Sequence, residues 1–389
     1  MKIRNRTALI SALILFATTA PSGAAVWTVE KDGSGDCTVI QDAVDAAADG
    51  DTLMVGPGRF DDYRRVDLGV WQGRIIHVLL NNRSLTIIGA GQSETIIGPT
   101  SEFAVTEHEG GIVLVYGAEL TLSDLTIERC YGGVECWDTS DLAVNRCTFR
   151  DHTWGVGCGV FSPQGAQIRD SQFQNYHTGV FPGSGSSGVI VERCEFRNMV
   201  YGMNTTATQN LTVSECRIEE SLLGIQLWSN STAALTDLDI TTDSVSLVIK
   251  DGSNADLTNS RLLGSIQRDL TTVWLTGHCT LTGTSNILRG NGTPPLRIFR
   301  SDVTLTDSHL LTSSGYAVYC EPPSYPEDHK TIDLRNNWWG VGDADSVAAL
   351  IFDANDTPDL DIYVDYLPFR EEQVSSESMS MGDLKRLYR

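Results

Sequence analysis

The stretch LTLSDLTI, residues 120–127, is repeated as LAVNRCTF at residues 142–149 and in six later copies. The copies share one phrase of apolar, polar and small residues, and successive copies are 22 to 25 residues apart. A period of this length indicates a solenoid, in which each repeat packs only against its neighbours. The copies start at Leu120, Leu142, Ala166, Val189, Leu211, Ala233, Ala255 and Val303, with a degenerate copy near Thr280.

Each copy predicts two short strands, and a third strand follows at a fixed distance. The apolar residues stand at the first, third, sixth and eighth positions, which is the alternation of strands that bury one face. Farther on, a small residue precedes an apolar one, as in Gly133-Val134 and Gly179-Val180. Three short strands per coil predict an all-β fold, a single-stranded parallel β-helix. A β-sandwich or barrel also has alternating strands, but it gives no reason for the constant distance to this small residue.

Stacking the coils places equal positions of successive copies about 4.8 Å apart. The eighth position forms a column of large side chains, and we expect Phe149, Phe173 and Phe196 to stack inside the core. Each coil buries roughly five apolar groups at about 1.5–3 kcal/mol each, offset by the entropy of ordering the chain. The coils should therefore fold as one unit. Most copies have Cys or Ser at the sixth position, and we interpret its cysteines as apolar fillers rather than disulfide partners: Cys147, Cys194 and Cys216.

The segments around the repeats predict the domain organisation. Residues 1–25 place basic residues ahead of a short apolar run and have the pattern of a bacterial secretory signal peptide. Residues 26–51 are expected to form an N-terminal cap of one strand and one helix, with Thr38 and Gln41 as a capping box. The rest divides into the parallel β-helix at residues 52–335, a closing segment around NNWWG at residues 336–370, and a flexible tail at residues 371–389.

Both ends of the repeat region carry a family resemblance. Residues 26–60, VWTVEKDGSGDCTVIQDAVDAAADGDTLMVGPGRF, resemble the N-terminal cap of secreted right-handed parallel β-helix proteins of the pectate lyase-like superfamily. Residues 336–340, NNWWG, resemble the C-terminal close of many bacterial right-handed β-helix repeat proteins, in which paired tryptophans plug the last coil. The resemblance implies a right-handed parallel β-helix with an N-terminal capping helix. It implies no specific activity.

The chain is acidic, with a formal net charge of −22 at pH 7. A surface of this charge repels nucleic acid and anionic membranes, so we expect no nucleic-acid partner. The apolar run near the N-terminus is too short to cross a bilayer and no comparable run follows, so we expect no transmembrane segment. We expect a monomer that the signal peptide directs to the periplasm or the extracellular space.

The outward positions of the third strand carry the candidate binding residues. Flat aromatic side chains beside amide and charged groups suit sugar rings, and the glycines expected between them, Gly157 and Gly159, would leave a trough. An ordinary solvent-exposed face is the alternative. We predict that a polysaccharide or cell-surface glycan binds at Glu135, Trp137, Phe181, Asn204, Gln226, Trp228 and Lys250.

No residue is assigned a catalytic role. Membership of the pectate lyase-like superfamily would imply an arginine base with calcium in a lyase, clustered aspartates in a hydrolase, or an aspartate nucleophile in an esterase. The local signatures NTD, GHG and DPH are missing from the sequence. Acidic residues at 353–361 could hold calcium but lack the spacing of a known calcium loop, so no metal or cofactor is predicted. The remaining candidates for acid–base chemistry are Asp61, Asp62, Arg64 and Arg65 in one loop, and His152 with His177 at one turn.

Three classes of function follow from this pattern. The first is an exported β-helix protein that binds carbohydrate or has an unassigned activity. The second is a divergent polysaccharide lyase, epimerase or hydrolase, which leaves open whether the chain is an enzyme. The third is a periplasmic metal-delivery accessory or a structural or adhesive surface protein.

Overall fold

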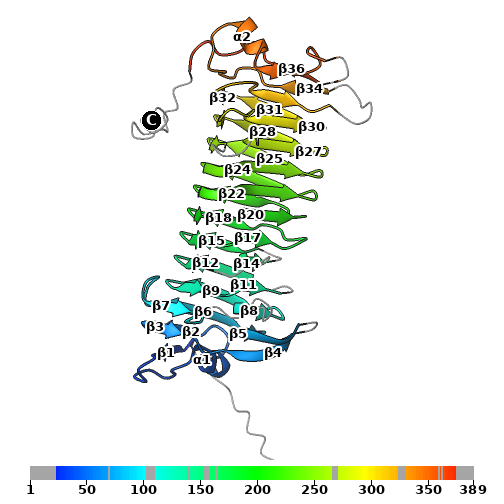
Figure 1. Ribbon diagram of the computed structural model, residues 1–389. Helices are drawn as coiled ribbons and strands as arrows, with labels where there is room; N and C mark the ends of the chain where they lie inside the picture. The colour runs from blue at the N-terminus through cyan, green and yellow to red at the C-terminus, as the bar shows by residue number, and fades with distance from the viewer. Residues whose placement is uncertain are drawn as a thin grey trace, which may run out of the picture.

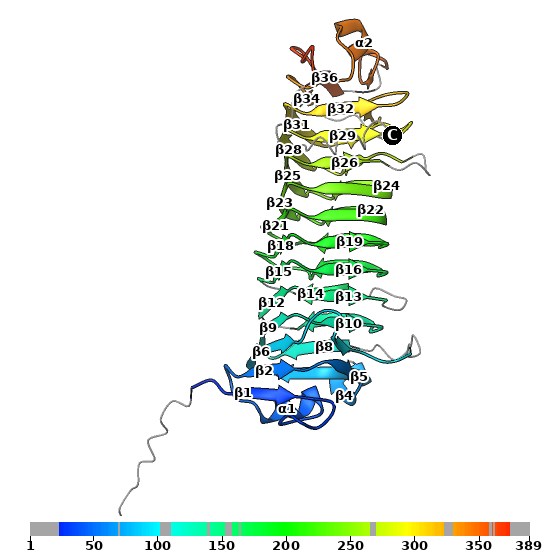
Figure 2. The ribbon, with the colours of Figure 1, turned by 90° about the vertical axis from the view of Figure 1, so that its left-hand side faces the viewer.

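The computed structural model describes residues 23–68, 71–101, 110–137, 141–151, 158–162, 165–264, 270–322, 330–357, 360 and 362–373. The chain forms a tall stack of coils, and the strands lie across the long axis of the stack (Figure 1). A view turned by 90° shows the same strands as rungs of one ladder (Figure 2). The predicted parallel β-helix is confirmed.

The first strand of each coil builds one continuous parallel sheet. Its outward and inward residues alternate, as in the burial pattern of β25, where Ala255 and Leu257 face the core. This first column contains β1 (Val26–Val29), β2 (Thr52–Val55), β6 (Ser84–Gly89), β9 (Glu119–Ser123), β12 (Asp141–Asn145), β15 (Gln167–Arg169), β18 (Ile190–Glu192), β21 (Leu211–Ser214), β23 (Thr232–Thr236), β25 (Asn254–Thr258), β28 (Thr280–Thr284), β31 (Asp302–Thr306), β34 (Lys330–Asp333) and β36 (Ile362–Asp365).

A short turn leads from the first to the second strand of each coil. Residues such as Asp124, Arg146 and Asp170 adopt positive φ there, which lets the chain change direction within very few residues. The second column contains β3 (Gly58–Phe60), β7 (Thr95–Ile97), β10 (Thr126–Glu128), β13 (Thr148–Arg150), β16 (Gln172–Gln174), β19 (Glu195–Arg197), the first halves of β22 (Arg217–Trp228) and β24 (Asp239–Lys250), β26 (Arg261–Leu263), β29 (Ile287–Gly290) and β32 (His309–Thr312).

The third column is the one that carries the candidate binding residues. One antiparallel strand, β4 (Arg64–Leu68), pairs with the first member of this column, β5, and forms a hairpin with it. The third column contains β5 (Trp71–Asn81), β8 (Gly110–Val115), β11 (Gly132–Cys136), β14 (Cys158–Ser162), β17 (Thr178–Pro182), β20 (Tyr201–Thr206), the second halves of β22 and β24, β27 (Val273–Thr276), β30 (Leu296–Phe299), β33 (Val318–Cys320) and β35 (Ile351–Phe352).

The core is a set of side-chain ladders along the axis. Phe149, Phe173 and Phe196 are fully buried. Their rings are stacked, with centroids 4.9 and 4.8 Å apart and interplanar angles of 7° and 6°. The predicted phenylalanine column is therefore confirmed. Cys147, Cys194 and Cys216 are buried free thiols in one ladder. This agrees with their interpretation as apolar fillers of the core.

A helix closes the N-terminal end of the stack. Helix α1 (Ile40–Ala46) buries Ile40, Ala43 and Val44 and lies beside β1 at one end of the ladder (Figures 1 and 2). The predicted capping box is wrong, because Val39 is the N-cap residue and no side chain caps the helix. The Gln41 side chain instead accepts from the backbone N–H of Leu79 at 2.7 Å and donates to its carbonyl at 3.1 Å. A tertiary contact with β5 has replaced the local one.

The opposite end is closed by the segment around NNWWG. Trp339 is buried and joins the main core, whereas Trp338 is only half-buried. Asn337 is also buried, accepts from the backbone N–H of Ser308 at 2.8 Å and donates to the carbonyl of Leu305 at 2.7 Å. One tryptophan and one asparagine thus close the last coil, rather than two tryptophans. Helix α2 (Ala344–Ala348) follows at the far end of the ladder (Figure 1).

Within the described residues, no helix is long and apolar enough to cross a membrane. The predicted signal peptide, apart from its last residues, and most of the predicted flexible tail lie outside the described residues.

Candidate binding face

The outward positions of the third column, as the strand register sets them, form two parallel lines. Strand pairing sets the first, here called the outer line: Glu135, Phe161, Phe181, Asn204, Gln226, Val248, Trp274, Arg297, Tyr319 and Phe352. The second, here called the edge line, lies two residues farther along each strand and includes Thr206, Trp228, Lys250, Thr276 and Phe299.

The strand register corrects the expected trough. Val134 pairs with Val160, which places Phe161 rather than Gly157 beside Glu135. The edge line therefore does not pass through Gly159 either. The reason is a longer connection ahead of β14, which shifts the third strand relative to the start of that repeat. Counting from the repeat start cannot detect such a shift, because the extra residues lie between the strands.

The N-terminal part of the face is covered, so two predicted contact residues are not on an open surface. Glu135 is only 6% exposed and forms an ion pair with Arg74, which is 4% exposed and comes from β5. Trp137 packs on a small apolar cluster outside the main core, formed by Ile76 and Val113 among others. Glu135 faces outward from its coil as predicted, but it is not exposed, because β5 of the β4–β5 hairpin supplies the Arg74 side chain that covers it.

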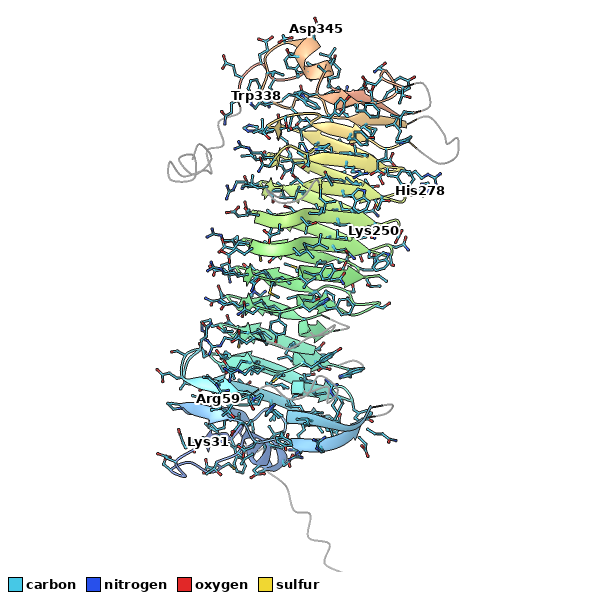
Figure 3. The ribbon with its side chains drawn as sticks, viewed as in Figure 1. Lys31, Arg59, Lys250, His278, Trp338 and Asp345 are labelled. Atoms are coloured by element: carbon cyan, nitrogen blue, oxygen red, sulfur yellow. The ribbon has the colours of Figure 1, made fainter. Side chains whose placement is uncertain are left out.

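The middle part of the face is open around Trp228. This side chain is 40% exposed. The ammonium group of Lys250, one coil farther, lies over the indole ring, 5.1 Å from its centroid. Phe181 and Asn204 are half-buried, and Gln226 is 8% exposed, so these three side chains form a floor beside Trp228 rather than projecting from the surface. Figure 3 shows Lys250 on this face, part-way along the stack.

The C-terminal part of the face carries an aromatic and cationic group that was not predicted. The Arg297 guanidinium lies 5.8 Å from the ring centroid of Trp274 and 5.9 Å from that of Tyr319. Tyr319 stacks on Phe352 at 4.8 Å and 8°. Arg297 also pairs with Glu321, so its charge is compensated. Counting from the start of each repeat could not find these residues, because the connections ahead of β27, β30 and β33 are longer and shift the third strand.

The other chemical candidates do not converge. Asp61 and Asp62 pair with Lys31, whereas Arg64 pairs with Asp45 at 2.8 Å. Arg65 donates to the carbonyl of Gly73 at 3.1 Å. Arg64 and Arg65 lie on strand β4 rather than in the predicted loop, and the charged side chains of this segment are used in separate local contacts.

The histidine and acidic candidates are likewise tied to local structure. His177 packs against Tyr201, and burial lowers the pKa of its imidazole, whereas His152 lies outside the described residues. Asp353 is buried and accepts from the backbone N–H groups of Asn355 and Val364 at 2.8 and 2.9 Å, which shapes its own loop. Nowhere in the described part of the chain do three or more His, Cys, Asp or Glu side chains form a group that could hold a metal ion.

Sequence comparison agrees with the fold. The family described as "Right handed beta helix region" matches residues 155–294. The protein is a right-handed parallel β-helix. The resemblance expected from its sequence is therefore confirmed at the level of the fold, and no specific enzyme family is implied. A search of curated protein sequences found no match.

Several solved structures are similar to this right-handed β-helix. They include the A-module of the mannuronan C-5 epimerase AlgE6 from Azotobacter vinelandii, with 13% identity over 77% of this chain and 88% of that one and a TM-score of 0.40. The catalytic unit of an α-1,3-glucanase from Streptomyces thermodiastaticus is 12% identical over 78% of this chain and 67% of that one, with a TM-score of 0.44. Pectate lyase Pel9A is 10% identical over 93% of this chain and 83% of that one, with a TM-score of 0.37. At these identities and TM-scores the likeness carries no conclusion about activity.

Proposed function

We propose that this β-helix is exported and binds an extended carbohydrate along the open part of its third column. The observation that carries the proposal is the combination of the exposed Trp228 with the amide groups of Asn204 and Gln226 and the cation of Lys250 on one face. Aromatic rings contact the C–H faces of sugars, while amide and charged groups bind their hydroxyl or acidic groups.

The length and the charge of the face agree with a polymeric ligand. The outer line runs from Phe181 on β17 to Tyr319 on β33, which is six coil steps or about 29 Å at the strand spacing. Three cations lie over rings of this face: Lys250 over Trp228, Arg297 over Trp274, and Arg300 over Phe299 at 5.1 Å. The charge of Arg297 is compensated by Glu321, which leaves Lys250 and Arg300 as candidate contacts for acidic groups. A polysaccharide that repeats along its length could contact successive coils in the same way.

Affinity electrophoresis tests this function without a known ligand. The protein would be run in gels containing polygalacturonate, alginate or soluble 1,3-glucan, and we expect at least one polymer to retard it. Trp228→Ala should reduce the retardation by about tenfold in apparent affinity, or ~1.4 kcal/mol. Tyr363→Ala is the matched control, because Tyr363 is a 37% exposed aromatic residue on the first column. Equal retardation of wild type and Trp228→Ala, or none with any polymer, would refute the proposal.

Export is tested separately. Expression of the full chain in a Gram-negative host, followed by fractionation, should place the protein outside the cytoplasm, with its mature N-terminus close to Ala25. A cytoplasmic protein that keeps Met1 would contradict the export part of the proposal and leave the binding part unaffected.

A further inference from the structure

Two hollows lie on the outward face of the first column. The first has a volume of about 400 Å³ and is lined mainly by residues of β6, β9, β12 and β15, and the second has about 420 Å³ and is lined mainly by residues of β21, β23, β25 and β28. Figure 2 shows the strands of this column along one edge of the ladder. Both volumes lie within the range of ordinary ligand sites, about 300–1,000 Å³. The first column therefore offers a surface for a ligand that is separate from the third column.

A small side chain at one outward position opens each hollow. Strand pairing places Ala234 between Thr212 and Asp256, one coil to either side, in the second hollow. Ala143 has the corresponding place in the first hollow. The coil between the two hollows carries the larger Ile190 at the same position. The second hollow, here called the Ala234 hollow, is thus a separate site that exists because alanine leaves space there.

The Ala234 hollow is lined by neutral polar groups and alanines. Asn210 and Asn254 are exposed, and their amides can both donate and accept hydrogen bonds. The carboxylate of Asp256 already accepts from the Thr282 hydroxyl at 3.2 Å. None of the described residues that line this hollow is aromatic or cationic. A ligand here would be held by hydrogen bonds along its length rather than by ring stacking or by attraction to a cation.

Charge and strand pairing restrict the kind of ligand. An acidic polymer would be repelled by Asp256 and by a chain whose formal net charge is −22. A peptide strand could not add to the sheet here, because β21, β23, β25 and β28 are each paired on both sides and offer no sheet edge. A neutral polysaccharide fits, since its hydroxyl groups both donate and accept hydrogen bonds and recur along the chain.

We propose that the Ala234 hollow binds a segment of a neutral polysaccharide through the hydroxyl and amide groups of its lining. The four strands of the hollow span three coil steps, about 14 Å at the strand spacing, which suits a segment of a polymer. The hollow around Ala143 is the poorer site, because a neutral ligand would displace water from two exposed carboxylates, those of Glu119 and Asp141, without supplying a counter-charge. This inference does not rest on the binding function proposed for the third column.

Matched alanine substitutions test the site. All proteins compared carry Trp228→Ala, so that the third column contributes little, and are run in gels containing laminarin, galactomannan or hydroxyethyl cellulose. We expect at least one of these neutral polymers to retard the Trp228→Ala parent. Adding Ala234→Phe fills the hollow and should lower the apparent affinity for that polymer by about tenfold. Ala143→Phe, the same substitution at the corresponding position of the other hollow, is the control and should change the affinity by less than about twofold.

Two checks separate binding from folding. Phenylalanine is well accepted at outward strand positions, and a urea denaturation curve of each variant shows whether it is folded. Asn254→Ala removes one amide of the lining without adding volume and should lower the apparent affinity by about fivefold. This second variant decides the question if Ala234→Phe does not fold.

The outcomes are distinct from those that concern the third column. Loss of retardation in Ala234→Phe and Asn254→Ala, with Ala143→Phe unaffected, supports the site. Equal loss in Ala143→Phe, normal retardation of a folded Ala234→Phe, or a parent that no neutral polymer retards overturns it. Retardation of the parent by polygalacturonate that Ala234→Phe abolishes also overturns it, because the ligand would then be acidic. The function proposed for the third column is judged separately, by comparing wild type with Trp228→Ala.

Discussion

Removing the central ring of the phenylalanine ladder tests whether the stacked core holds the coils together. Phe173 is fully buried, and its ring lies 4.9 Å from that of Phe149 and 4.8 Å from that of Phe196. In Phe173→Ala the two remaining rings cannot close the gap, because parallel pairing of β13, β16 and β19 keeps them two coils, about 10 Å, apart.

The cost should therefore lie near the upper end of the usual range for Phe→Ala in a core, about 3–5 kcal/mol. Phe173→Leu retains most of the apolar volume and should cost less than the alanine variant. Urea denaturation followed by circular dichroism gives the change in unfolding free energy. Gln174→Ala, on the same strand with its side chain outward, is the control and should stay within about 0.5 kcal/mol of wild type. If Phe173→Ala destabilises no more than Gln174→Ala, the ladder does not stabilise the stack as argued.

Three further predictions concern buried charges and thiols. Glu135→Leu leaves the buried Arg74 guanidinium without its carboxylate and should lower the unfolding free energy by about 3–5 kcal/mol in urea, while Arg74→Met combined with Glu135→Leu should recover most of it; no recovery would show that the pair is not the cause. Burial opposes ionisation of Glu128, but hydrogen bonds and ion pairs with two arginines outweigh it and leave its pKa below 4.5. The ionised Glu128 carboxylate then stabilises the fold fully above its ordinary pKa, and this contribution is lost as the pH falls through its lower pKa in the folded protein. Glu128→Gln should therefore make the urea midpoint fall less steeply as the pH is lowered. An unchanged dependence of the midpoint on pH would contradict this. Burial raises the pKa of Cys147 to about 12, so mass spectrometry should find it alkylated only after unfolding, and labelling in the native protein would argue against the packed column.

The repeat by itself determined the coil architecture and the contents of the core. Side chains in the same phase of successive coils must stack, because strand pairing repeats at one spacing. The sequence phase of Phe149, Phe173 and Phe196 was therefore enough to predict their contact, and that of Cys147 and Cys216 enough to predict burial. These predictions needed no knowledge of loops.

Only the tertiary structure decided which part of the outer surface is open and where each outward residue lies. Glu135 has the phase of an exposed residue but is buried with Arg74, which lies 61 residues earlier in the chain and reaches it through the β4–β5 hairpin. The place of Phe161 in the outer line and the partners of Trp274 depended on connections whose lengths differ from coil to coil. The inward-facing positions are constrained by a core that recurs in every coil, whereas the outward-facing positions depend on loops and covering segments that do not repeat. A periodic pattern therefore determines which side chains are buried in the core, and only the folded chain decides which outward side chains are exposed.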